Sequence, residues 1–161
     1  MRTAVYPGSF DPMTFGHLDI VDRARCMFDR IYVAIAINSA KSTLFSLEER
    51  RSLTQEVLKD RKDVEVVTFE GLLTDFARNV NATAIVRGIR AVTDFDYEYA
   101  VYQVNRQLNP NVDTVFLLAS QKYSFISSTI IKEVARYGKS LSEYAPPEVS
   151  QALLKKFGHM A

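Results

Sequence analysis

The stretch at residues 6–17 combines the residue types of an anion-binding loop. It reads Tyr-Pro-Gly-Ser-Phe-Asp-Pro-Met-Thr-Phe-Gly-His and lies between a short strand-like run and an amphipathic helical pattern. Gly8 and two prolines turn and stiffen the loop, Ser9 offers a hydroxyl and a backbone N–H, and Gly16 keeps the first helical turn open. A helix N-terminus carries unpaired N–H groups and roughly half a positive charge, to which His17 adds a directed donor. The stretch therefore predicts an anion site, with an ordinary turn between strand and helix as the alternative for this segment alone.

Basic and hydroxyl residues also follow the later apolar runs of the chain. Lys41 lies in a polar loop after the run at 31–37, and Arg87 and Arg90 flank a glycine after the run that begins at Ala84. Two arginines placed in this way favour anion binding. The chain has neither Gly-x-Gly-x-x-Gly after its first strand pattern nor Gly-x-x-x-x-Gly-Lys, which excludes the dinucleotide fingerprint and the P-loop.

Strand-like and helix-like patterns alternate along the chain. Strands are expected at 3–6, 31–37, 64–69, 84–87 and 114–118, and helices at 16–28, 46–58, 72–79, 93–108, 128–137 and 146–157. Ser46 and Glu49 form a capping box, and Thr93 is expected to cap the long fourth helix. The alternation predicts an α/β fold with a Rossmann-like, doubly wound five-stranded parallel sheet and helices on both faces. Such a sheet would gather the candidate residues at the carboxyl ends of its strands, where ligands bind.

Composition limits the class of protein. The 161 residues fit a single domain (1–161), and the net charge of +1 argues against a large nucleic-acid surface or an anionic-membrane partner. The single cysteine, Cys26, cannot form an internal disulfide and is expected to be a buried thiol in the first helix, which indicates a reducing compartment. The apolar run at 31–37 is too short to span a bilayer, so we expect a cytoplasmic protein.

Two motifs together carry a family resemblance. Thr14-x-Gly16-His17 and Ile126-Ser-Ser-Thr129 resemble the paired signatures of the nucleotidyltransferase superfamily. The segments Tyr-Pro-Gly-Ser-Phe-Asp-Pro (6–12), Phe-Ser-Leu-Glu-Glu-Arg (45–50), Arg-Gly-Ile-Arg (87–90), Asp-Phe-Asp-Tyr-Glu (94–98) and Ser-Phe-Ile-Ser-Ser (124–128) are similar to bacterial phosphopantetheine adenylyltransferases. The resemblance implies that ATP and 4′-phosphopantetheine are joined into dephospho-coenzyme A and pyrophosphate, with Mg²⁺, by a homohexamer.

The resemblance also implies a role for each matching residue. His17 would be catalytic, as a donor to the α-phosphate, although it could instead be a capping or core histidine. The ATP-binding residues would be Ser9, Phe10, His17, Gly88, Ile89, Arg90, Glu98, Tyr123, Ser124, Phe125, Ile126, Ser127, Ser128 and Thr129. The phosphopantetheine-binding residues would be Ser9, Lys41, Leu73 and Arg87. No protein metal ligand is expected, because neither histidine has a partner at metal-ligand spacing and Mg²⁺ would arrive on the ATP phosphates.

Some questions stay open at this stage. Thr14 replaces the first histidine of the superfamily motif, and Lys132 replaces an arginine, so the role of each is undecided. The helix at 93–108 has more aromatic surface than one sheet contact needs, which suggests subunit contacts unless the helix is buried within the monomer. A sister adenylyltransferase or cytidylyltransferase with another acceptor, or a nucleotide-binding module without catalysis, remains an alternative.

Overall fold

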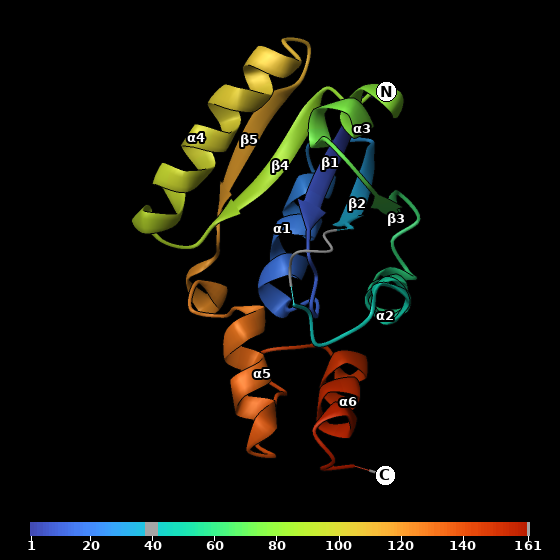
Figure 1. Cartoon of the computed structure of the whole chain (residues 1–161), viewed down its shortest axis with the longest axis vertical. Coiled ribbons are helices and arrows are strands. Elements are labelled where there is room, and N and C mark those ends of the chain that lie inside the picture. Colours follow the sequence, from blue (N-terminus) through green and yellow to red (C-terminus); the bar gives the residue numbers. More distant parts are fainter. Residues whose placement is uncertain (38–41, 161) are drawn as a thin grey trace.

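A computed structural model describes residues 1–37 and 42–160. In this part of the chain five parallel strands form one sheet in the order β3-β2-β1-β4-β5 (Figure 1). The strands are β1 (Thr3–Gly8), β2 (Arg30–Ala36), β3 (Val64–Phe69), β4 (Ala84–Ile89) and β5 (Asp113–Leu118). The helices are α1 (Phe15–Arg25), α2 (Leu47–Leu58), α3 (Leu73–Asn79), α4 (Val92–Leu108), α5 (Ser128–Arg136) and α6 (Pro147–Lys156), with a short 3₁₀ turn, η1 (Gln121–Tyr123). The predicted α/β fold is confirmed.

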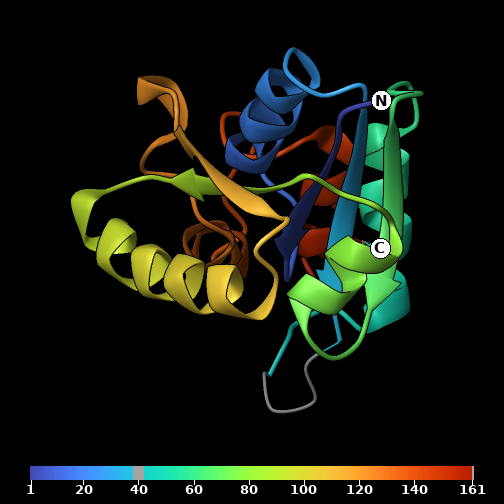
Figure 2. The same ribbon diagram turned by 90° about the horizontal axis from the view of Figure 1, so that it is seen from above.

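Alternation of side chains along the strands gives the sheet two apolar faces. Ala4 and Tyr6 of β1 pack in one core cluster together with residues of α1 and α2, whereas Val5 packs in a second cluster with residues of α3. Figure 2 shows α1 on one side of the sheet, and α3 and α4 on the other. Because both faces are covered, the central strands need apolar residues at almost every position, as in the run at 31–37.

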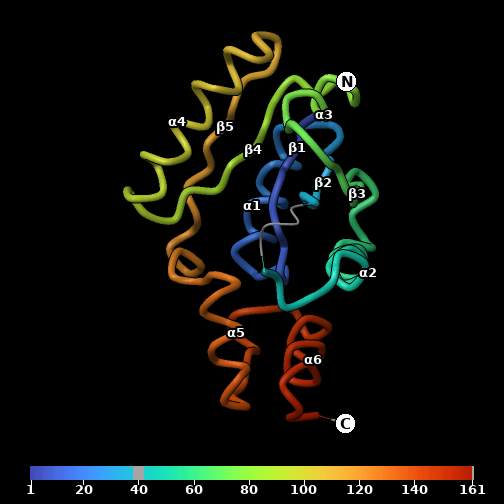
Figure 3. Tube along the Cα trace, in the orientation of Figure 1, coloured from blue at the N-terminus to red at the C-terminus, as the bar shows by residue number. Residues whose placement is uncertain are grey.

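Helices α5 and α6 lie beyond the carboxyl ends of the strands. Figure 3 traces the chain from β5 through the 3₁₀ turn into α5, which runs away from the sheet beside α6. These two helices share a third core cluster that includes Phe45 and Ile126. The end of the sheet at which ligands are expected is therefore bordered by the last third of the chain.

Several local predictions are wrong. Helix α1 ends at Arg25, so Cys26 is its C-cap and is exposed, while Met27 and Phe28 pack against the core in its place. Helix α4 begins at Val92 with Ala91 as its N-cap and no side-chain cap, so Thr93 lies inside the helix.

Two strands are longer than expected. β1 continues through Gly8, which pairs with Ile35, and β4 continues through Ile89, which pairs with Leu118. The ladders extend this far because their neighbouring strands β2 and β5 continue beside them. Arg87 is consequently held within a strand and does not follow it.

Helix α4 is poorly covered in the single chain. None of its residues is buried, and its Val92 and Tyr97 are 85% and 69% exposed. Its sheet-facing side contacts Phe116 of β5 through Phe95 and Tyr102.

Within the described residues, no helix combines the length and the apolar character needed to cross a membrane.

Candidate active site

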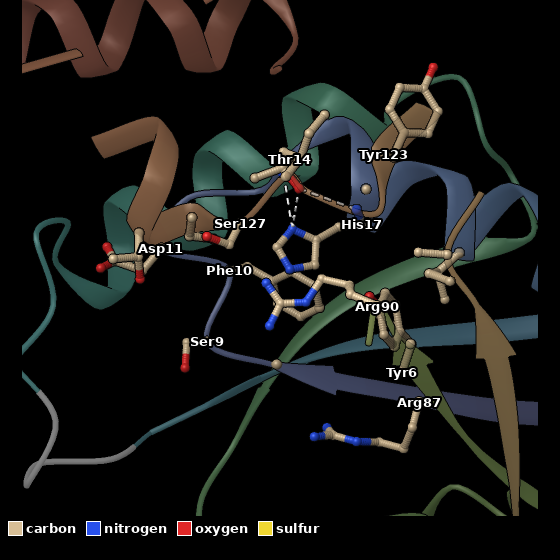
Figure 4. A pocket seen from close by; sticks show the side chains of 18 of the residues that line it. Tyr6, Ser9, Phe10, Asp11, Thr14, His17, Arg87, Arg90, Tyr123 and Ser127 are labelled. Atoms are coloured by element: carbon tan, nitrogen blue, oxygen red, sulfur yellow. Dashed lines mark hydrogen bonds between the residues drawn. The ribbon is translucent and has the colours of Figure 1, made fainter. Parts of the chain in front are cut away.

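A cavity of about 380 Å³ opens at the carboxyl ends of β1 and β4 (Figure 4). Its wall is built by the loop after β1, the first turns of α1, the ends of β4 and α4, the segment after β5 and the start of α5. The lining residues are Tyr6, Pro7, Gly8, Ser9, Phe10, Asp11, Thr14, Gly16, His17, Ile20, Ser42, Arg87, Gly88, Arg90, Glu98, Ala119, Tyr123, Ile126, Ser127, Ser128, Thr129 and Lys132. The strand order reverses between β1 and β4, which is where doubly wound sheets bind their ligands.

His17 both caps α1 and faces the cavity. The Thr14 backbone N–H donates to His17 Nδ1 at 3.0 Å, and the His17 backbone N–H donates to Thr14 Oγ1 at 3.3 Å, which completes a capping box. Because Nδ1 accepts a hydrogen bond, this network assigns the ring proton to Nε2. Thr14 therefore both caps the helix and fixes the tautomer of His17. The Nδ1 side of the imidazole takes part in the cap, and the Nε2–H group is available to a ligand.

The ring of His17 is neutral at physiological pH. Burial, together with a smaller effect of the positive charge of Arg90, lowers the pKa of His17 to about 4. Edge contact with the Phe10 ring, whose centroid is 5.2 Å away, holds the imidazole plane. A neutral imidazole with this tautomer can donate a hydrogen bond from Nε2, but it cannot take a proton at that atom.

Gly16 brings the two sequence motifs together. A Cβ at Gly16 would lie 3.6 Å from the carbonyl oxygen of Tyr123 and 3.8 Å from that of Ile126, so the start of α1 lies directly against the loop after β5. Ser128 Oγ adds a hydrogen bond of 2.8 Å to the carbonyl of Pro12. The first helical turn of α1 therefore packs beside the backbone of the loop after β5, and the two motifs form one wall.

Asp11 and Lys132 form an ion pair in the cavity wall. Lys132 Nζ lies 2.9 Å from Asp11 Oδ2, and the same carboxylate accepts hydrogen bonds from the backbone N–H groups of Leu44 and Phe45. Burial acts to raise the pKa of Asp11, but hydrogen bonds from Lys132, Phe45 and Leu44 outweigh burial and hold this pKa below its ordinary value. Asp11 is therefore charged and ties the loop after β1 to the segment before α2.

Arg87 is held by Glu98 and by the end of β1. Arg87 Nε donates to Glu98 Oε2 at 2.7 Å, a second bond joins Nη2 to Oε1, and Nη1 donates to the carbonyl of Pro7 at 3.2 Å. Arg90, the first residue after β4, bonds to Asp94, and its side chain is 46% exposed. Two guanidinium groups therefore border the cavity, and each of them is paired with a carboxylate of α4.

Gly8 gives the Phe10 ring its place. A Cβ at Gly8 would lie 2.8 Å from Phe10 Cζ, which is closer than such atoms approach, so only glycine allows the ring to fold back against β1. The ring is 2% exposed and also meets Tyr6 edge-on, with centroids 5.5 Å apart. Burial raises the pKa of Tyr6, so its hydroxyl stays neutral beside the cavity.

Most residues named from the sequence line this cavity, and a few do not. Ser9, Phe10, His17, Arg87, Gly88, Arg90, Glu98, Tyr123, Ile126, Ser127, Ser128 and Thr129 are in the wall. Ile89 is buried in β4, Leu73 begins α3 and packs in the core, and Phe125 is 59% exposed beside Tyr144. Ser124 bonds to the carbonyl of Gln121, and Lys41 lies outside the described residues.

Sequence reasoning missed several wall residues. Tyr6, Asp11, Ile20 and Lys132 line the cavity without having been assigned a role from the sequence. A signal was available for Lys132, which follows Ser128 by four residues and so shares its face of α5. For Asp11 the signal was weaker, because its partners lie 33 to 121 residues away.

Protein ligands for a metal ion are scarce in this site. Among the described residues, no group of three or more His, Cys, Asp or Glu side chains could hold a metal. The two carboxylates that line the cavity, Asp11 and Glu98, are each paired with a cation.

Comparisons with known proteins give the family of this chain. The cytidylyltransferase-like family model matches residues 5–134. A phosphopantetheine adenylyltransferase of Caldanaerobacter subterraneus subsp. tengcongensis is 50% identical over 157 residues, which cover 98% of each chain. Another, from Leptospira biflexa serovar Patoc, is 53% identical over 154 residues, which cover 96% of each chain.

Solved structures share the fold at lower identity. A putative nicotinate-nucleotide adenylyltransferase from Vibrio parahaemolyticus superposes with a TM-score of 0.72 at 20% identity, over 96% of this chain and 99% of the other. A nicotinic acid mononucleotide adenylyltransferase from Plasmodium falciparum, complexed with NaAD, gives 0.67 at 14% identity, over 97% and 95%. From its identity to full-length relatives and the family model that it matches, the chain belongs to the phosphopantetheine adenylyltransferase family of cytidylyltransferase-like proteins.

Proposed function

We propose that this protein transfers the adenylyl group of ATP to 4′-phosphopantetheine, with release of pyrophosphate and formation of dephospho-coenzyme A, in coenzyme A biosynthesis. The observation that carries the proposal is the His17 Nε2–H donor, held by Thr14 in a cavity that two guanidinium groups border. Family membership supports the identity of the acceptor.

The proposed reaction needs positioning and positive charge, and it needs no base. An oxygen of the phosphopantetheine phosphate attacks the α-phosphorus of ATP in line, and the bond from that phosphorus to the bridging oxygen of pyrophosphate breaks. The attacking phosphate is already an anion at neutral pH, so no proton has to be removed. A neutral donor and fixed cations suit this chemistry, because they stabilise charge on the phosphate oxygens without competing for a proton.

The charged and hydrogen-bonding groups of the wall have separate roles in this proposal. His17 Nε2–H donates to an α-phosphate oxygen in the transition state, and Arg90, whose field acts on His17, binds the ATP phosphates. Arg87 holds the phosphate of the incoming pantetheine, and Glu98 orients the Arg87 head through its two bonds. Ser127 caps α5 by accepting from the Ile130 N–H at 3.2 Å. Residues 127–129 line the cavity, so the N-terminus of α5 would serve as a further phosphate site.

Mg²⁺ enters this proposal bound to the ATP phosphates. It would supply charge neutralisation on the polyphosphate. The pairing of Asp11 with Lys132 and of Glu98 with Arg87 leaves these carboxylates committed to protein cations, which supports a metal held mainly by the nucleotide.

We also propose that copies of the chain pack on α4 and form a homohexamer. The exposed apolar residues of α4, among them Val92, Tyr97 and Val104, support a subunit contact, and the family resemblance supports six copies. The consumption of ATP supports a cytoplasmic location.

Pyrophosphate release tests the function. The protein is incubated with ATP, Mg²⁺ and 4′-phosphopantetheine, and pyrophosphate is compared with a blank without enzyme. Release only with phosphopantetheine is the expected result. Equal release with nicotinamide mononucleotide would favour a sister enzyme, and no release above the blank would favour a nucleotide-binding module.

Substitution of His17 tests its role. His17→Ala is expected to lower kcat by roughly 100-fold or more, as removal of one transition-state donor does, with a smaller change in the KM for ATP. A variant that keeps a near-normal kcat and only raises the KM for ATP would remove His17 from the transition state. Arg51→Ala, on the exposed side of α2, serves as the control.

A further inference from the structure

Arg50 is a buried cation with an unusual environment. It lies on α2 and is 6% exposed, yet it forms no ion pair with any described carboxylate. Its Nη1 donates to the carbonyl of Ser9 at 2.8 Å, whereas its Nε is buried without a hydrogen-bond partner among the described residues. A buried guanidinium that is only partly satisfied costs stability.

The bond to Ser9 fixes the direction of the next N–H group. The only cis peptide in the described residues joins Asp11 to Pro12, so the Ser9–Phe10 peptide is trans and its C=O and N–H point in opposite directions. The carbonyl points to Arg50 on α2, and the Phe10 N–H therefore points away from α2. Ser9 and Phe10 both line the cavity, and within the described residues the Phe10 N–H has no hydrogen-bond partner.

The backbone at Phe10 needs this support. Its φ of 43° lies in the left-handed region, which costs a bulky residue about 1–2 kcal/mol. Tyr6 and His17 hold the ring from inside the protein, and Arg50 holds the preceding carbonyl from α2. Asp11 in turn binds the N–H groups just before α2, so helix and loop fix each other's position.

We infer that Arg50 is a positioning residue that orients the Ser9–Phe10 peptide, so that the Phe10 N–H faces the cavity as a donor to a nucleotide phosphate. A cation on the carbonyl also polarises the peptide and strengthens its N–H as a donor. The inference rests on the proposed function in taking ATP as the ligand, but it concerns binding of the phosphates and not their transfer.

Equilibrium binding without phosphopantetheine tests the inference. Arg50→Met removes the donor, Arg50→Lys keeps a cation that can reach the carbonyl, and Arg51→Met changes the exposed neighbour on the same helix. Dissociation constants for ATP and for adenosine are measured by calorimetry, with thermal unfolding of each variant as the check on folding.

Arg50→Met is expected to weaken ATP binding by about tenfold or more, the loss typical of one hydrogen bond to a charged group, and to leave adenosine binding unchanged. Arg50→Lys is expected to recover most of the ATP affinity, and Arg51→Met to match the parent. Unchanged ATP affinity in folded Arg50→Met would overturn the inference, and so would an equal loss for ATP and adenosine, because only disruption of the whole site would produce it.

A second measurement needs no variant and decides the matter if Arg50→Met does not fold. Unmodified protein labelled with ¹⁵N-phenylalanine is titrated with inorganic pyrophosphate, and the Phe10 amide signal is expected to shift downfield as its N–H gains an acceptor. A Phe10 signal that stays in place while pyrophosphate binds would overturn the inference. A protein that passes these tests and yet releases no pyrophosphate with phosphopantetheine would refute the proposed function alone.

Discussion

Acidification tests the protonation state that the structure assigns to His17. Burial, with a smaller effect of Arg90, lowers the pKa of His17 from 6.5 to about 4. The folded protein should therefore keep a neutral ring over a pH range in which the unfolded chain has already bound a proton there. We expect the ring signals of His17 in NMR spectra to stay constant from about pH 8 to about pH 5, with nitrogen shifts that place the proton on Nε2.

The effect on stability has a definite sign and size. Above pH 6.5 the ring is neutral in both states, so His17 contributes no pH dependence. As the pH falls from 6.5 towards 4, the unfolded chain binds the proton first, and the free energy of unfolding decreases. At about 1.4 kcal/mol for each pKa unit, the loss in the free energy of unfolding is at most about 3 kcal/mol. Solvent in the open cavity screens the charge on the ring, so the actual loss should be smaller.

Denaturant unfolding of the parent and of His17→Gln over this pH range isolates the effect. Other acid-sensitive groups, Asp11 among them, act in both proteins and cancel in the difference. The chain has two histidines, so the substitution also assigns the His17 signal, and His159 gives a reference in the same spectrum. Equal pH dependence in the two proteins, or a His17 signal that titrates near pH 6.5, would refute the assignment of a buried neutral ring.

Further predictions concern the cavity wall and the exposed helix. Asp11→Asn is expected to lower the free energy of unfolding by roughly 2–4 kcal/mol, measured by denaturant unfolding, because it leaves Lys132 unpaired. This loss should shrink in acid, since the lowered pKa of Asp11 means that its contribution is present above its ordinary pKa and disappears as the pH falls through the folded value. Gly8→Ala is expected to raise the KM for ATP because its methyl group would meet the Phe10 ring, and a second change, Phe10→Leu, should recover part of the loss. Val104→Glu on α4, at a residue that is 54% exposed, is expected to reduce the mass measured by sedimentation, because a charge would oppose subunit packing.

Each of these predictions has an outcome that contradicts it. A stability of Asp11→Asn equal to that of the parent would show that the Lys132 pair contributes nothing net. An additive loss in the Gly8 and Phe10 double variant would mean that the two residues do not conflict. An unchanged mass for Val104→Glu would exclude that part of α4 from any subunit contact.

The fold could be predicted from the sequence because its information is local and periodic. Continuous apolar runs such as 31–37 indicated buried parallel strands, and the Ser46–Glu49 capping box marked the start of α2 correctly. Predictions of burial failed at helix ends, where the position of the last helical residue decides which side chains face the core. Cys26 lies next to Met27 and Phe28, so the sequence placed all three in one helix, whereas the helix ends at Arg25 and only the latter two pack on the core.

The site could be predicted only in part, because its contacts are between distant residues. The motif residues were found through resemblance, which did not reveal that Asp11 pairs with Lys132, 121 residues away. Arg50 and Arg51 are neighbouring arginines near the start of one helix, and the sequence assigned a role to neither. The structure distinguishes them by the burial of Arg50 and its bond to Ser9, which depend on how α2 packs against the loop after β1.

A Cβ at Gly16 would touch the carbonyls of Tyr123 and Ile126, so the cavity wall joins two segments that are far apart in the sequence. Residues 9–17 are synthesised before the segment after β5, and the cavity wall that the two share is not complete until that later segment has been made and docked. A nucleotide bound in this cavity would contact both segments at once, and its binding free energy would then stabilise only the completed domain and not a folding intermediate that lacks the later segment. Ligand binding should accordingly make unfolding of this domain more cooperative, since neither segment can detach without release of the nucleotide.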